Sequence, residues 1–425
     1  MPKTLQRLKN IPSHFDFHGY NKIGDNTDPN VIALLLGIHP KFMDRIPCHS
    51  SYSAVMDDCP MLWKQFEREG YVTVLGEDSP VMGLFHNGKS AYVEQPTDYY
   101  NRPGYMASED IISHNVGTYS YYFKNCQGDK PSIKVIHDYA LKALDTFRDV
   151  PLFGVFWTAS TSHENLNDAS AVDEYQAEFI NKLEKYGHLN NTAVFFLSDH
   201  GLRFGSIRST YIGSLEERLP YMFLMLPQWL QKKYPTTWMS LGTNTGRLVT
   251  NFDFYNTIQD ILHMNYESND IVDKQKLLGD LNTTVPNLTN QITVNSKEKL
   301  SDNTIGHIHS KLNGNNTMKV LASSLSRNNS VQQSVMKPIV LEDNILLGHS
   351  LFRAVSPYRT CQDMFIPDHF CTCITTKPID LVGKLAQEAA QFLIKEINSK
   401  IQQYPLCQHW KLHKVSSIDC LIQLI

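Results

Sequence analysis

Strand-like and helical patterns alternate along the first half of this 425-residue chain. Short apolar or alternating runs, which are typical of strands, occur in "FDFHGY", "YVTVL", "PLFGVFW", "TAVFFLS" and "YMFLMLP". Between them lie segments such as "KVIHDYALKALDTF", where apolar residues recur at intervals of three and four, as an amphipathic helix requires. This alternation predicts an α/β fold with a mostly parallel central sheet and helices on both faces.

The overall composition excludes several classes of protein. With 42% hydrophobic and 19% charged residues, the chain has an ordinary globular composition. A net charge of −4 and the lack of a long cationic run argue against a nucleic-acid partner. The longest apolar stretch near the start, "VIALLLGI", is far shorter than the roughly 20 residues that cross a bilayer. We therefore expect no membrane span in this chain, and no signal peptide is recognisable.

The patterns divide the chain into three parts. Residues 1–265 carry the alternating pattern of the predicted core. Residues 266–335 are dominated by Asn, Ser, Thr and Lys, which predicts an exposed, partly mobile insertion. Residues 336–425 are expected to return to the core and to end in a cysteine-containing segment with one long helical pattern.

The cysteines and glycosylation motifs suggest an oxidising compartment. Of the eight cysteines, Cys361, Cys371, Cys373 and Cys407 lie in or near the two late segments "RTCQDMFIPDHFCTC" and "YPLCQHW". Because Cys-x-Cys without a matching second pair is a poor zinc signature, disulfide bridges are the better interpretation. Five Asn-x-Ser/Thr motifs occur, at Asn190, Asn282, Asn287, Asn315 and Asn328. Together these features predict a protein of the secretory pathway lumen or the extracellular space.

Two residues that can bind a metal stand at the end of a predicted strand. Asp199 and His200 directly follow "TAVFFLS", and Gly201 comes next. Ligands of open α/β sheets bind at this carboxyl edge of the strands. A carboxylate and an imidazole are suitable ligands for Zn²⁺ or Mn²⁺, and a glycine lets the backbone turn away. Taken alone, an Asp-His pair is more often a helix cap or a surface turn.

A second feature is the helix start in "GDNTDPN". Thr27 lies just before Asp28 and Pro29, which suit the cap and first turn of a helix. The residues fit a simple capped helix. They also fit a nucleophile, because a hydroxyl at the positive end of a helix is well placed to attack an anionic phosphoryl or sulfuryl centre. Such a hydroxyl needs a metal to become an alkoxide at neutral pH.

Seven blocks in one order resemble a known family: "GDNTDPN", "GYVTVLGEDSP", "QPTDYYNRP", "FGVFWTASTSHENLN", "FFLSDHGLRFG", "LEERLP" and "RTCQDMFIPDHFCTC". They are similar to domain of unknown function 229 (DUF229), a sulfatase-like branch of the alkaline phosphatase superfamily. The resemblance implies an alkaline-phosphatase-like three-layer sandwich. It also implies that Asp199 and His200 bind one divalent metal, Zn, Mn or Ca, and that Thr27 is the nucleophile, with Asn26 beside it in the pocket.

The resemblance also assigns the residues that would contact the substrate. Arg203 is either a clamp on the substrate anion or an ordinary surface charge. His163 follows another predicted strand, where histidines of related enzymes contact the phosphate or bind a second metal. Members with two metals carry an aspartate four residues earlier, and this chain has Ala159 there. We therefore expect a single metal and a substrate or leaving-group contact for His163.

Three further residues are candidates for the pocket. Glu77 and Asp78 follow the predicted strand "YVTVL", where they either line the pocket or cap a helix. His349 matches a late histidine of two-metal relatives, but with a partner missing we expect a structural or rim position for it.

The chain departs from the superfamily pattern at its start. The first strand, which normally ends in a metal-binding aspartate, should precede the helix of "MPKTLQRLKN". Neither Asp16 nor Asp25 is a convincing substitute, because the first lies inside a strand-like run and the second belongs to the turn before Thr27. We expect that this is a truncated isoform or an incomplete gene model, in which one metal ligand and a central strand are missing.

Two functions follow from these observations. The first is a metal-dependent hydrolase or transferase for phosphate or sulfate esters of a small molecule, glycan or lipid headgroup. Threonine at position 27 favours phosphoryl chemistry, because sulfatases need a Cys or Ser to convert into formylglycine. The second is a catalytically impaired binding protein on the same scaffold. A serine hydrolase is disfavoured, since no Gly-x-Ser-x-Gly motif is present.

Overall fold

The computed structural model describes residues 1–45, 55–80, 83–86, 91–116, 126–163, 165–263, 347–378, 380, 382–404, 408–413 and 419–423. The insertion predicted at 266–335 lies outside these residues and stays a prediction, as do the domain boundaries beside it. The same holds for Cys407 and for four of the five glycosylation motifs, at Asn282, Asn287, Asn315 and Asn328.

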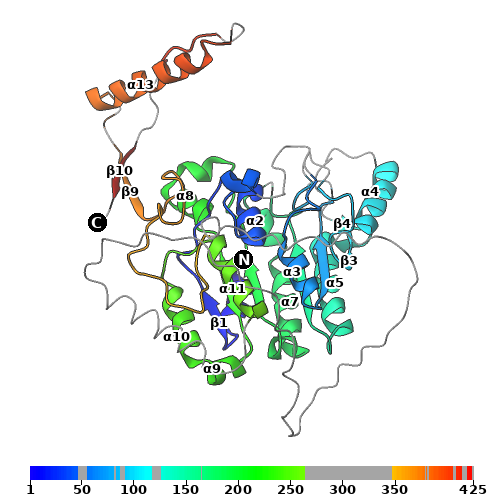
Figure 1. Ribbon diagram of the computed structural model, residues 1–425. Helices are drawn as coiled ribbons and strands as arrows, with labels where there is room; N and C mark the ends of the chain where they lie inside the picture. The colour runs from blue at the N-terminus through cyan, green and yellow to red at the C-terminus, as the bar shows by residue number, and fades with distance from the viewer. Residues whose placement is uncertain are drawn as a thin grey trace, which may run out of the picture. The chain divides into compact units, whose positions relative to one another are not determined.

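Two three-stranded sheets form the centre of the described structure (Figure 1). One is parallel and has the order β3 (Tyr99–Tyr100), β2 (Val72–Glu77), β6 (Leu152–Trp157). The other is antiparallel and has the order β1 (His14–Asp16), β8 (Met222–Met225), β7 (Val194–Leu197). In the described residues β6 and β7 are each paired on one side only, and their apolar side chains are half-buried whereas those of β8 are buried.

Helices cover both faces of the parallel sheet. Successive side chains of a strand point to opposite faces, and Phe153 and Phe156 of β6 are three positions apart. Phe153 stacks on Phe66 of α3 (Leu62–Arg68) with ring centroids 4.1 Å apart. Phe156 meets Tyr139 of α5 (Ser132–Thr146) at 6.0 Å on the other face.

The antiparallel sheet is covered in the same way. Phe195 of β7 packs against Phe254 of α11 (Asn251–His263), with ring centroids 5.3 Å apart. The next residue, Phe196, packs into an apolar cluster with Leu183 of α7 (Asp173–Lys185) and Leu8 of α1 (Pro2–Lys9). Both sheets therefore lie between helical layers, and the predicted α/β class is confirmed.

The direction of the second sheet differs from the prediction of a mostly parallel sheet. The chain leaves β7 through residues 198–210, which include η3 (Ser206–Ser209), then forms α8 (Tyr211–Arg218) and enters β8. The amide of Gly201 donates to the carbonyl of Glu217 at 3.1 Å, and that of Ser198 donates to Tyr221 at 3.0 Å. Because α8 is held at the end of the strand and does not cross the sheet face, the chain reverses and β8 pairs antiparallel with β7.

The remaining elements complete the layers and the chain's last part. The helices are α2 (Thr27–Leu36), η1 (Pro40–Arg45), α4 (Arg102–Val116), α6 (Asp168–Ala171), η2 (His188–Asn190), η3 (Ser206–Ser209), α9 (Trp229–Lys233), α10 (Pro235–Asn244) and α13 (Lys384–Ile401). The strands are β4 (Cys126–Gln127), β5 (Lys130–Pro131), β9 (Ile374–Pro378) and β10 (Asp419–Gln423). Among the described residues, no helix combines the length and apolar character of a membrane span.

The predicted bridging of the late cysteines is found for one pair. Cys361 and Cys371 form a disulfide, and Cys59 is also disulfide-bonded. Cys373 is a free thiol whose pKa is raised by burial. The disulfides agree with an oxidising compartment.

Candidate functional site

The loop that carries Asp199 and His200 is fixed by α8. Besides the hydrogen bond from its amide to Glu217, Gly201 lies so close to α8 that an added Cβ would sit 2.1 Å from the carbonyl oxygen of Glu216. The Ser198 hydroxyl donates to the carbonyl of His200 at 2.8 Å, which fixes the other end of the loop. Only glycine allows this close approach, so packing against α8 explains the glycine that follows the Asp-His pair.

The two side chains present a pair of ligand atoms to one point. His200 Nδ1 lies 2.8 Å from the carbonyl oxygen of Gly201, which requires a proton on Nδ1 and leaves a lone pair on Nε2. This Nε2 atom is 3.4 Å from Oδ2 of Asp199, and both atoms are buried without a hydrogen-bond partner. With a neutral imidazole the lone pair and the carboxylate oxygen repel each other in this buried site, and either a proton on Nε2 or a metal cation between the two atoms relieves the repulsion.

The spacing fits a metal ion. Two ligands at about 2.1 Å from a tetrahedral ion such as Zn²⁺ lie about 3.4 Å from each other. Asp199 and His200 therefore fit a divalent metal in donor type, tautomer and separation.

The turn before Thr27 is held by one buried side chain. The Asn30 Oδ1 atom accepts from the amides of Ile23 at 2.9 Å and Gly24 at 3.3 Å, and its Nδ2 donates to the carbonyls of Gly24 and Asn26. Thr27 is the first residue of α2, and Asn26 precedes it with extended backbone and no capping hydrogen bond from its side chain. The turn thus presents Thr27 at the positive end of a ten-residue helix.

The turn before Thr27 and the loop of Asp199 and His200 lie against each other. Arg203 Nη1 is 3.0 Å from Oδ2 of Asp25, two residues before Thr27. The amide of Lys22 donates to the carbonyl of Arg218 at the end of α8, the helix that also holds Gly201. Through these contacts the structure brings the segments of Thr27, Asp199, His200 and Arg203 together. Arg203 is paired with Asp25, and its Nε is buried without a hydrogen-bond partner.

His163 lies beside the same loop. Its ring centroid is 6.1 Å from that of Phe204, and the Arg203 guanidinium is 5.1 Å from the same Phe204 ring. The loop before His163 is anchored by Asp78, whose carboxylate accepts from the amides of Ala159 and Ser160 and from the Ser160 hydroxyl. Burial raises the pKa of Asp78. Asp78 therefore supports the loop of His163, and its oxygens are occupied by protein donors.

Glu77 serves a neighbouring loop. Its carboxylate accepts from the Tyr100 hydroxyl at 2.5 Å and from the amide of Leu84 at 2.6 Å, and it is buried. Burial raises its pKa. The predicted pocket-lining role of Glu77 stays a prediction, and the structure adds that its oxygens hold residues 83–86.

His349 belongs to a different junction. Its amide donates to Asp253 at the start of α11, and its side chain is exposed. Among the described residues, no contact joins His349 to Asp199 or His200. Its rim or structural position stays the expectation.

Two functional candidates escaped the sequence analysis. Lys22 is fully buried and forms an ion pair with Glu217, which is also buried. Both residues stand inside or beside blocks that carry the family resemblance, "GDNTDPN" and "LEERLP", so the signal was available. A charged residue in a sequence is ordinarily expected at the surface, which is why the pair was missed.

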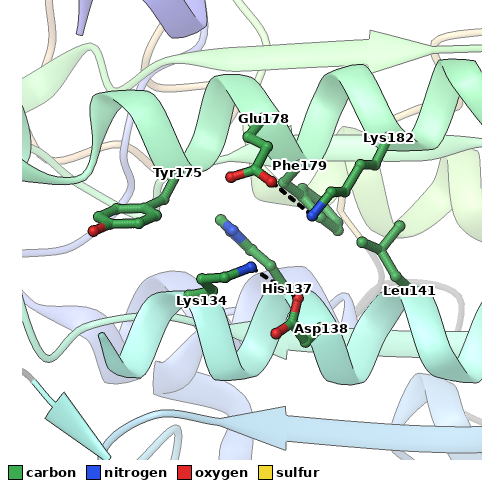
Figure 2. A pocket seen from close by; sticks show the side chains of 8 residues that line it. All are labelled: Lys134, His137, Asp138, Leu141, Tyr175, Glu178, Phe179 and Lys182. Carbon is green, nitrogen blue, oxygen red and sulfur yellow. Dashed lines mark hydrogen bonds and ion pairs between the residues drawn. The ribbon is translucent and has the colours of Figure 1, made fainter. Parts of the chain in front are cut away.

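A small hollow lies elsewhere, between α5 and α7. Figure 2 shows His137 of α5 pointing toward α7, between the Lys134–Asp138 pair and the Glu178–Lys182 pair. The hollow encloses about 10 Å³, which holds one water molecule at most. None of the predicted site residues lines it.

The buried His137 predicts an acid-sensitive stability. Its ring stacks on Phe179 at 4.3 Å, and burial lowers its pKa to about 4. Between pH 6.5, the usual histidine pKa, and pH 4, the His137 imidazole is protonated in the unfolded chain but stays neutral in the folded one. The free energy of unfolding should therefore fall by about 3 kcal/mol over this range. Urea unfolding at several pH values should show this loss, and H137L should reduce it. H409L, at an exposed histidine, should keep the wild-type slope; an unchanged slope in H137L would contradict the prediction.

Several solved structures are similar to the chain over part of its length. The structure described as Ps i-CgsB in complex with k-i-k-neocarrahexaose is 16% identical, with 63% of this chain and 68% of that chain covered and a TM-score of 0.39. Lipoteichoic acid synthase LtaP from Listeria monocytogenes is 13% identical (53% and 59% covered, TM-score 0.36). The C-terminal periplasmic domain of EcEptC from Escherichia coli, in complex with Zn, is 12% identical (61% and 74%, TM-score 0.37).

No protein with a curated function matches the chain. The family model described as "Protein of unknown function (DUF229)" matches residues 1–284 and 284–416. The match covers nearly the whole chain, as the seven ordered blocks predicted. The chain belongs to the DUF229 family.

Proposed function

We propose that the chain is a metal-dependent hydrolase or transferase that acts on phosphate esters, with sulfate esters as the second choice. The observation that supports this most directly is the buried pair of ligand atoms on Asp199 and His200, 3.4 Å apart, beside the turn of Thr27. An anionic substrate would suit this place, because it combines the start of α2 at Thr27, the cationic Arg203 and a pair of side chains able to bind a metal.

Each residue has a defined part in the proposed reaction. A divalent ion held by Asp199 and His200 would supply positive charge that favours an ionised Thr27 hydroxyl and the developing charge of the ester. The Thr27 oxygen attacks phosphorus, the bond from phosphorus to the leaving alcohol breaks, and a phosphothreonine forms. Water or an acceptor alcohol then takes the phosphoryl group from Thr27. Arg203 steadies the anion, and His163 contacts the leaving group.

A catalytically impaired binding protein is the second candidate, and one observation favours it. Among the described residues, the only three His, Cys, Asp or Glu side chains whose ligand atoms lie close together are Cys361, Cys371 and Cys373, and the first two are joined in a disulfide. Asp199 and His200 therefore lack a third side-chain ligand within the described part of the chain. A weakly held ion would support anion binding better than turnover.

The proposed substrate is an ester of a small molecule, a glycan or a lipid headgroup in the secretory pathway lumen or outside the cell. Support comes from the disulfide of Cys361 and Cys371 and from Asn190, the glycosylation motif that the structure describes, which is exposed. Both features belong to an oxidising, glycosylating compartment.

The proposed nucleophile can be tested directly. We expect T27A to lower the hydrolysis of bis-p-nitrophenyl phosphate, measured with Zn²⁺ or Mn²⁺ present, by at least about 1,000-fold, because it removes the proposed nucleophile. T27S should retain measurable activity, and T243A, at an exposed threonine of α10, should equal the wild type. Because loss of one p-nitrophenol from this diester leaves the second ester in place, mass spectrometry of acid-quenched wild-type protein should find a p-nitrophenylphosphoryl group on Thr27. Full activity in T27A would exclude this mechanism.

A further inference from the structure

A fully buried ion pair joins the two segments of the candidate site. We propose that Lys22 and Glu217 are positioning residues that hold the turn of Thr27 against the loop of Asp199 and His200. This inference rests on the proposed function for its catalytic consequence, whereas its structural part can be measured without any substrate.

Lys22 is enclosed on every side. Its side chain has 0% exposure, and the ammonium group is ion-paired with Oε1 of Glu217. The Nζ atom also lies 3.4 Å from the carbonyl oxygen of Asp25 and 4.2 Å from the centroid of the Phe370 ring. Burial lowers the pKa of Lys22, while the contact with Glu217 opposes that shift. The ammonium group thus contacts the turn that leads to Thr27 through the carbonyl of Asp25.

Glu217 contacts both segments at once. Its side chain, 3% exposed, binds Lys22, and its main-chain carbonyl accepts the amide of Gly201 at 3.1 Å. The next residue, Arg218, accepts the amide of Lys22 at 3.0 Å. The last turn of α8 therefore lies between the two segments, and the ion pair fixes one of them to it.

Further charges of alternating sign extend the Lys22–Glu217 pair to Arg208 at one end and to Arg203 at the other. Arg208 lies 3.6 Å from the second oxygen of Glu217, Lys22 lies 3.9 Å from Asp25, and Asp25 lies 3.0 Å from Arg203. Three cations and two anions leave one net positive charge in this chain of contacts. Asp25 is thereby bound by two cations, which fixes Arg203 beside the turn.

Buried ion pairs are poor sources of stability, because desolvation offsets most of their attraction. Replacing both members by apolar residues of similar size is often tolerated, whereas removing one leaves a buried charge. A fully buried pair at this position is therefore better explained by geometry than by stability. The double variant K22M/E217M separates the two explanations, since it removes the pair without leaving a lone charge.

The experiment compares wild type, K22M/E217M, K22R and the surface double variant K3M/E174M, whose residues form an exposed pair at 3.1 Å. We expect K22M/E217M to fold, to bind Zn²⁺ within about 3-fold of wild type, and to lower kcat about 10 to 100-fold with little change in KM. K22R should recover part of kcat, and K3M/E174M should match the wild type. A kcat per folded site equal to wild type in K22M/E217M would overturn the proposal.

Hydrogen exchange provides the substrate-free measurement. In K22M/E217M the amides of Ile23 and Gly24 should exchange at least about 10-fold faster than in wild type, while amides of α5 stay unchanged. If the wild type hydrolyses no ester but this local change appears, the proposed function fails and the positioning role stands. If the exchange of Ile23 and Gly24 is unchanged, the positioning role fails whatever the activity.

Discussion

D199N is expected to abolish tight binding of a divalent ion and to lower ester hydrolysis at least about 1,000-fold. The Oδ2 atom of Asp199 is buried without a hydrogen-bond partner, 3.4 Å from the equally unpartnered Nε2 of His200. An amide in place of the carboxylate removes the negative charge from this pair and can turn a donor toward the imidazole lone pair. A hydrogen bond between the two side chains would then take the place of the proposed cation.

Metal content after dialysis, together with titration calorimetry of Zn²⁺ and Mn²⁺, measures this effect. H200Q should show a similar loss, because it removes the other ligand atom. E178Q is the matched control, since Glu178 is paired with Lys182 at 2.7 Å in the hollow between α5 and α7. Equal metal binding in wild type and D199N would show that the paired atoms are not a metal site and would remove the main support for the proposed function.

The strands and helices followed from local patterns, but the pairing of the strands did not. The run "TAVFFLS" forms β7, and the amphipathic pattern near His137 forms α5. Both could be predicted because the spacing of apolar residues along the chain indicates a strand or a helix. The antiparallel direction of β7 and β8 depends on the close approach of Gly201 to α8. Such a contact forms between residues that are separated along the chain, so the spacing of apolar residues does not predict it.

The candidate site shows the same division. Asp199 and His200 could be named because their position at a strand end has a chemical meaning by itself. Lys22 and Glu217 are 195 positions apart, and only the folded chain brings them together. The position of Asp78 predicts either a pocket-lining residue or a helix cap, which stays a prediction; the structure adds that its carboxylate binds the loop before His163.

A second large effect is expected on stability, from D253N. The Asp253 side chain is fully buried at the start of α11, and its two oxygens each lie 2.9 Å from Nη1 of Arg359, which is 6% exposed. The same carboxylate accepts the amides of Thr250 at 2.8 Å and His349 at 2.9 Å. It therefore joins the segment around residues 347–360 to the core helix.

An asparagine at this position keeps the size of the side chain but leaves Arg359 as a buried cation without its counter-charge. We expect a loss of about 3–5 kcal/mol in the free energy of unfolding, measured by urea denaturation. The control is D260N on the same helix, because Asp260 pairs with Arg353 at 3.8 Å and both side chains are partly exposed. That pair should contribute at most about 1 kcal/mol. Equal losses in the two variants would mean that the Asp253 contacts contribute no more than a surface pair, and that the segment of His349 is held to α11 by apolar packing instead.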